Sequence, residues 1–169
     1  MKNWKKPLTE IGWFMGTIAL STAIMLAFYP VWLIVMLLTV LIAHEMGHFS
    51  AAKLMGAKSK LPFFVPLGPL VMGATWVKTK NLTDQIRVIS MAGPFAGFLV
   101  AAAMFIALIL VGSNIGAIFA AGLASREVLS ATIGSDGRRF RKAKKGEKSL
   151  NTFPRISVPI DVHANWSMT

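Results

Sequence analysis

The amino-acid sequence predicts an all-α, polytopic membrane protein with about four transmembrane helices. Hydrophobic residues make up 54% of the 169 residues, charged residues only 15%, and the mean hydropathy is +0.59. These values are far from the balance of a soluble globular domain. The apolar residues fall into four long runs, and the basic residues behind the net charge of +11 gather at the flanks of these runs. Such flanking charge is typical of a membrane topology signal.

The first predicted span covers residues 11–28, an almost uninterrupted apolar stretch that is long enough to cross a bilayer. It follows the basic segment 1–6 and could be taken for a signal peptide. The apolar part is long for that role, and residues 26–30 offer no small-residue cleavage site, so we expect an uncleaved anchor. Pro30 then suits the first position of a second span, which is predicted at residues 31–55.

The third and fourth predicted spans cover residues 86–111 and 114–133. The fourth has the length of a span, but Arg126 and Glu127 interrupt it. Facing lipid, these charges are costly, whereas protein or water around them makes them tolerable. We therefore expect the fourth segment to be shielded by other helices, which is where a site would be built.

The second span carries the pattern His44-Glu45-Met46-Gly47-His48. Residues four apart lie on one face of a helix, so His44 and His48 can bind one tetrahedral metal ion with Glu45 beside them as a candidate general base. A chance pattern at a helix end is the alternative. Ionisable groups in a membrane segment persist mainly where they pair, bind a metal or line a cavity, which favours a metal site. The sequence has no cysteine, so any metal must be held by histidine and carboxylate.

The basic clusters predict that both termini are cytoplasmic. With the Lys-rich N-terminus inside, an even number of spans places Lys53, Lys58, Lys60 and the basic run 138–145 on that same side. His44 then lies roughly 20 Å below the outer start of its helix, about 10 Å from the cytoplasmic face of an apolar core roughly 30 Å thick. We expect a buried site nearer the cytoplasm.

A catalytic zinc site has three protein ligands and a water, so a third ligand is needed. The carboxylates besides Glu45 are Glu10, Asp84, Glu127, Asp136, Glu147 and Asp161. Asp136 follows the fourth span at its cytoplasmic end, at the depth predicted for the two histidines, and Gly137 would allow the backbone to turn there. An Asp-Gly pair is equally common as a simple helix stop or turn. The shared depth favours Asp136 as the third ligand.

Taken together, these residues resemble the site-2 protease family of intramembrane zinc metalloproteases. The resemblance rests on the motif at 44–48, on Ala92-Gly93-Pro94-Phe95-Ala96 and on Ser135-Asp136-Gly137-Arg138-Arg139, in the family's order over roughly residues 31–140. It implies that His44, His48 and Asp136 bind one zinc ion (Zn2+) per chain and that Glu45 activates the attacking water. It also implies that the substrate is a transmembrane or membrane-proximal segment of another protein.

The sequence also departs from the family's pattern. Val128 and Ala131 occupy places where many members carry Asn and Pro, and Gly97 replaces an Asn that often follows the Gly-Pro pair of the third span. We expect these changes to affect substrate alignment more than metal binding. A rival set of ligands would begin at Asn151-Thr152-Phe153-Pro154 and use Asp161, but that aspartate lacks a following glycine.

The loop at residues 57–84 is polar only at its ends. Its middle, residues 61–72, is apolar, too short to span and rich in helix breakers, so it could re-enter the membrane beside the site or pack on the helix bundle. An exposed strand edge there could hold an extended substrate by backbone pairing. Polar groups that could line a water path, or simply form helix-packing contacts, are Ser113, Asn114, Ser125 and Ser130.

We expect a cytoplasmic N-terminus at 1–10, a membrane-embedded metalloprotease core at 11–137 and a basic, polar cytoplasmic tail at 138–169. The tail is most simply an anchor on the lipid surface, and no nucleic-acid partner is expected, because its basic residues lack interleaved aromatics. Substrate choice would come from the core, the loop or a regulatory partner. Two other functions stay open: a metal-ion transporter, which should carry ligands on several helices, and an inactive scaffold, which should have lost the catalytic residues.

Overall fold

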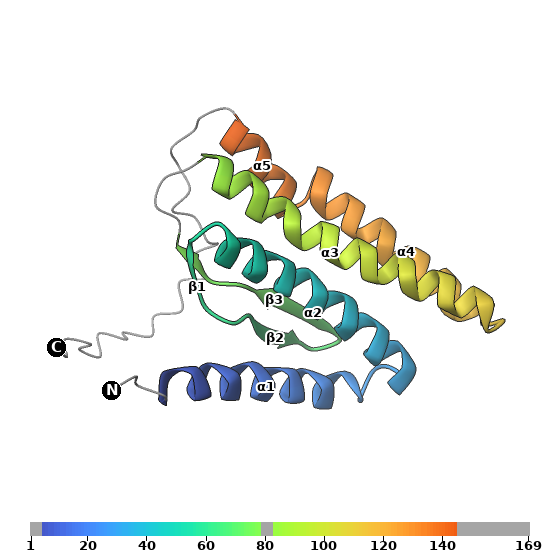
Figure 1. Ribbon diagram of the computed structural model, residues 1–169. Helices are drawn as coiled ribbons and strands as arrows, with labels where there is room; N and C mark the ends of the chain where they lie inside the picture. The colour runs from blue at the N-terminus through green and yellow to red at the C-terminus, as the bar shows by residue number, and fades with distance from the viewer. Residues whose placement is uncertain (1–4, 79–82, 145–169) are drawn as a thin grey trace.

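The computed structural model describes residues 5–78 and 83–144, which form five helices and four short strands (Figure 1). In chain order these are α1 (Lys5–Met25), α2 (Val31–Leu54), β1 (Lys58–Ser59), β2 (Phe63–Leu67), β3 (Leu70–Ala74), β4 (Val77–Lys78), α3 (Thr83–Leu110), α4 (Asn114–Thr132) and α5 (Ser135–Lys144). The strands make only two small two-stranded sheets, so the predicted all-α membrane class is confirmed.

Three helices in the described ranges are long and apolar enough to cross a membrane. They are α1 over Leu8–Met25, α2 over Val31–Leu54 and α3 over Asp84–Leu110. The fourth predicted span is the 19-residue helix α4, which packs beside α3 but contains Arg126 and Glu127 and is not among the three (Figure 1). The protein is therefore a multi-pass membrane protein with three apolar helices and a more polar fourth one.

Glycines in the left-handed region end two of these helices. Gly56 follows α2 with φ +70° and Gly112 follows α3 with φ +75°. In each case the amide after the glycine donates a hydrogen bond to the carbonyl five residues earlier, which satisfies a carbonyl at the helix end. Only glycine adopts this backbone conformation without strain, so both helices stop where the sequence predicts.

Helix α3 lies between the other helices of the bundle and contacts α2, α4 and α5. Gly47 lets α2 approach α3 closely, because a Cβ atom at this position would overlap the backbone of Ala92. Small residues at such contacts are typical of helix packing in membranes. The buried cluster shared by α2, α3 and α4 consists of Met36, Val40, Ala101, Ala120 and Leu123. This packing fixes α4, and with it α5, relative to the histidine motif of α2.

The apolar loop after α2 forms a hairpin between α1 and α2 (Figure 1). Strands β2 and β3 pair antiparallel, with Phe63 opposite Ala74, and Gly68 takes φ +66° in the two-residue turn. Phe64 is only 1% exposed and packs on Phe14 of α1, with ring centroids 6.0 Å apart. The hairpin thus joins α1 to the bundle and brings β3 alongside the α2 motif.

Candidate metal centre

One turn of α2 presents three of the predicted site residues. His44 and Glu45 are each 6% exposed and His48 is 9% exposed. The four-residue spacing places the two imidazoles on one helix face, with ring centroids 4.9 Å apart. The spacing argument from the sequence is therefore correct for the two histidines.

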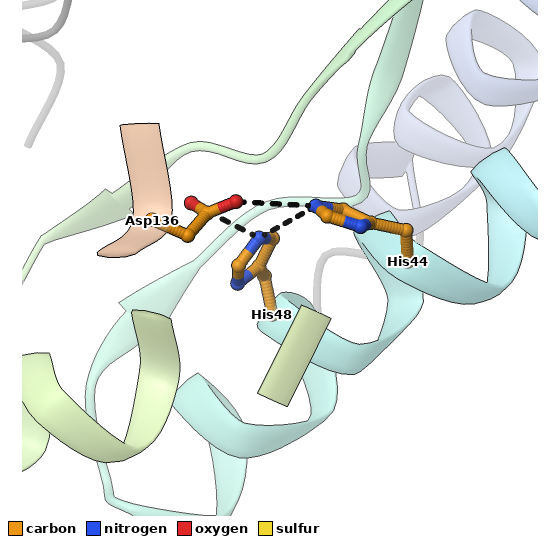
Figure 2. A group of neighbouring side chains, drawn as sticks. All are labelled: His44, His48 and Asp136. Atoms are coloured by element: carbon orange, nitrogen blue, oxygen red, sulfur yellow. Dashed lines mark hydrogen bonds and ion pairs between the residues drawn. The ribbon is translucent and has the colours of Figure 1, made fainter. Parts of the chain in front are cut away.

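Asp136 reaches the same place from α5. Helix α4 ends at Thr132, the chain turns at Ile133 and Gly134, and α5 begins at Ser135, so Asp136 lies in its first turn. The carboxylate is 4% exposed, and Figure 2 shows it facing the two imidazoles. The structure thus brings the third predicted ligand to the first two.

The expectation of a turn at Gly137 is wrong. This residue is helical, and the chain turns three residues earlier, at Gly134. What Gly137 supplies is space: a Cβ atom there would lie 2.6 Å from the carbonyl oxygen of Thr132 and would also overlap the carbonyl of Ala131. The absence of a side chain lets the start of α5 fold back against the end of α4, which carries Asp136 toward the histidines.

The ligand atoms of the three residues converge on one point. Nε2 of His44 and Nε2 of His48 are 3.2 Å apart. Asp136 places Oδ2 at 3.5 Å from the first nitrogen and Oδ1 at 3.6 Å from the second. In a tetrahedral zinc site with bonds of about 2.1 Å, neighbouring ligand atoms are about 3.4 Å apart. The separations agree with this value, so His44, His48 and Asp136 fit a zinc ion.

The outer nitrogens of both imidazoles are bonded to acceptors. His48 Nδ1 lies 2.7 Å from the backbone carbonyl oxygen of Ile89 in α3, and His44 Nδ1 lies 2.5 Å from Oε2 of Glu127 in α4. A carbonyl and a carboxylate oxygen accept, so Nδ1 of each ring donates and Nε2 is the nitrogen left to bind a metal. This tautomer is the one in which Nε2 binds a metal, and the bonded Nδ1 fixes the ring orientation.

The surroundings of Asp136 keep its carboxylate ionised. Burial alone would raise the pKa of Asp136, but without a metal the hydrogen bond with His44 and the charges of His48 and His44 lower it below its usual value. The hydroxyl of Ser130 also donates to Oδ2, at 2.9 Å. An ionised carboxylate is the state that a metal ligand requires.

Glu45 lies outside the three-ligand group and faces the hairpin. The hydroxyl of Thr75, just after β3, is 2.7 Å from Oε2 of Glu45 and 3.1 Å from its backbone oxygen. Gly73 of β3 is equally close, since a Cβ atom there would lie 2.5 Å from Glu45 Cγ. The Glu45 carboxylate therefore neighbours the three-residue group without being part of it.

The sequence did not identify two contacts of the site, those of Thr75 and Glu127. Thr75 follows an apolar loop whose hairpin pairing the sequence could not specify. Glu127 was recognised as a charge that needs shielding, but its partner could not be named, because the rotation of α4 relative to α2 depends on packing. Of the four polar residues proposed for a water path, Ser130 contacts the site, whereas Ser125 bonds back to Ala121 in its own helix. The rival Asp161 lies outside the described residues.

Gly93 of α3 leaves room for the His48 ring, and we expect Gly93→Ala to displace that ring. A Cβ atom at residue 93 would overlap His48 Nε2 and its two neighbouring carbons. The zinc affinity should fall by about tenfold or more, the size of effect seen when a ligand loses its support. Competition with a chromophoric chelator measures this. Gly122→Ala is the matched control, because its Cβ atom meets nothing within 4 Å. Equal zinc affinities of the two variants would contradict the role of Gly93 in leaving room for the His48 ring.

A comparison with protein families gives one match. The model of peptidase family M50 matches residues 32–167, a range that contains all four predicted site residues. Comparison with curated proteins and with solved structures found no match.

Proposed function

The chain belongs to peptidase family M50, and we propose that it is an intramembrane zinc endopeptidase that cuts other proteins in or near their transmembrane segments. The family match confirms the resemblance to site-2 proteases. The observation that carries the proposal is the convergence of His44, His48 and Asp136 beside Glu45. The two histidines and Glu45 lie on α2, a helix apolar enough to cross a membrane, so a peptide bond cut there must lie at or within the bilayer.

The chain's own residues account for the proton transfers of peptide hydrolysis. When bound by the three ligands, zinc supplies Lewis acidity toward a water molecule and the peptide carbonyl. Glu45 accepts the proton that the water loses as it attacks the carbonyl carbon. The same residue then donates this proton to the leaving amine nitrogen as the C–N bond breaks. Thr75 holds the Glu45 carboxylate on the hairpin side of the ligand group.

The position of Glu45 supports a substrate path along the hairpin. A substrate helix must unwind locally, because its carbonyls are hydrogen-bonded within the helix and wrapped by side chains. Strand β3 pairs with β2 on one side and runs to within one residue of Thr75. Its other edge could hold an unwound, extended segment by backbone hydrogen bonds. The substrate would then lie along the edge of the hairpin beside Glu45.

Removal of the metal tests this function directly. Membranes that contain the protein should yield cleaved fragments of single-pass proteins, which mass spectrometry identifies. Treatment with a zinc chelator should abolish these fragments, and added zinc should restore them, because the three ligands alone cannot activate water. Membranes without the protein are the control. Fragment patterns that do not respond to either treatment would contradict the proposal.

We expect both termini to be cytoplasmic and the site to lie nearer the cytoplasmic face. Helix α5 lies at the end of the molecule where α1 begins, which requires α4 to return across the bundle (Figure 1). Basic residues are enriched on the cytoplasmic side, and the sequence places them around the start of α1, around the end of α2 and after α4. Reporter fusions after Lys6 and after Lys148 should report the same side. Opposite sides would mean that α4 does not cross.

A further inference from the structure

Glu127 is a buried carboxylate that the proposed hydrolysis does not use. It comes from α4, and its side chain is 0% exposed. Moving an ionised carboxylate out of water is costly unless donors or cations satisfy both oxygens. The groups that contact Glu127 therefore indicate the role of this buried side chain.

Both oxygens of Glu127 have a partner. Oε1 accepts a hydrogen bond from Nη1 of Arg126 at 2.6 Å, and Oε2 accepts one from Nδ1 of His44 at 2.5 Å. The Arg126 side chain is 54% exposed, so it supplies the balancing positive charge from the edge of the site. The second oxygen is directed at the metal ligand.

From these contacts we infer that Glu127 is a positioning residue for the zinc ligand His44. The hydrogen bond keeps a proton on Nδ1, so Nε2, which faces His48 and Asp136, is the nitrogen available to a metal. The same bond holds the ring against rotation. This inference rests on the proposed zinc site and adds α4 to the helices that build it.

Helix α3 is shaped to accept the Glu127 carboxylate. A Cβ atom on Gly97 would lie 2.8 Å from Glu127 Cδ and 2.9 Å from Oε2. Gly97 is one helical turn after Gly93, which leaves the corresponding space for the His48 ring. One face of α3 therefore accommodates both the His48 ring and the group that orients His44. A side chain at residue 97 would push the carboxylate away from Nδ1.

Zinc affinity is the measurement that tests this inference. Chelator competition on the full chain in detergent should show about 10- to 100-fold weaker zinc binding for Glu127→Ala. Glu127→Gln keeps the shape and one acceptor but loses the charge, so its affinity should lie between those of Glu127→Ala and the wild type. Gly97→Ala should also weaken binding, and Gly122→Ala should not. Cobalt-substituted protein should show changed absorption bands in the weakened variants, because the His44 ring leaves its fixed orientation.

Leu123→Ala separates a positioning role from a general packing role. Leu123 is on α4, one turn before Glu127, and belongs to the buried helix cluster. Its truncation should lower the thermal stability but leave the zinc affinity of the folded protein within about threefold of the wild type. Equal losses of affinity in Leu123→Ala and Glu127→Ala would overturn the inference. Should Glu127→Ala fail to fold, Glu127→Gln decides, and wild-type affinity in that variant would equally overturn it.

The wild-type protein distinguishes this inference from the proposed function. If the wild-type chain binds no zinc, both the proposed function and the inferred role of Glu127 are wrong. A wild-type chain that binds zinc and cleaves substrate, with unchanged zinc affinity in the Glu127 variants, removes only the role of Glu127.

Discussion

Glu45→Gln should abolish cleavage of membrane-spanning substrates while the zinc content and the fold stay close to those of the wild type. The amide has nearly the same shape as the carboxylate but cannot accept the proton of the attacking water. General acid–base catalysis contributes about 10²- to 10⁴-fold to a rate, so fragments should become undetectable in an ordinary assay. The zinc content should not change, because Glu45 is not one of the three ligands.

The assay compares membranes with wild type and with Glu45→Gln and searches for single-pass proteins that accumulate uncut in the variant. Glu10→Gln is the matched control, since it makes the same chemical change in α1. Identical fragments from wild type and Glu45→Gln, with zinc bound in both, would refute the protease function. A metal transporter or an inactive scaffold would show no proteolysis in either case, and a transporter would instead show altered metal flux.

Asp136→Ala should lose both zinc and activity. Two imidazoles from one helix turn remain in this variant, and a catalytic site needs three protein ligands. Metal analysis of the purified protein should give about one zinc per wild-type chain and well below that for the variant. His44→Ala should behave in the same way, because it also removes one of the three ligands.

Asp84→Ala provides the control for the loss of an aspartate. Asp84 lies in the first turn of α3, where its side chain is 86% exposed and 3.5 Å from Arg87. This variant should keep its zinc and its activity. Wild-type zinc content in Asp136→Ala would exclude Asp136 from the site and would leave the third ligand to be found elsewhere in the chain.

Hydropathy predicted the helices because the bilayer imposes a length and an apolar character on each span. The predicted segments 31–55, 86–111 and 114–133 agree with α2, α3 and α4 to within three residues at each end. Helix α1 begins at Lys5, six residues before the apolar segment, because a helix continues past the apolar core while hydropathy marks only the core. The hairpin was not predicted as a hairpin, since strand pairing depends on contacts with α1 and α2.

The candidate site was predictable where the chemistry is local in sequence. The two histidines and Glu45 share one helix turn, so their spacing determines their geometry. Asp136 was inferred from its predicted depth and from the resemblance of residues 135–139 to a family motif. The residues that make its approach feasible act through packing, as the space beside Gly137 shows. Glu127 contacts His44 across 83 positions of sequence, a distance over which spacing carries no information about rotation or depth.

The number of helices that contribute to the candidate metal centre affects the stability of the folded state. His44 and His48 come from α2, their Nδ1 atoms donate hydrogen bonds to α4 and α3, and Asp136 comes from α5. The three ligands and the acceptors that orient them therefore come together only when four helices are assembled. A ligand that binds only the folded state stabilises it, by about 4.1 kcal/mol at a free concentration one thousand times the dissociation constant. Zinc bound as proposed should therefore stabilise the folded chain, and a low abundance of a ligand variant would reflect the loss of this stabilisation as well as the loss of catalysis.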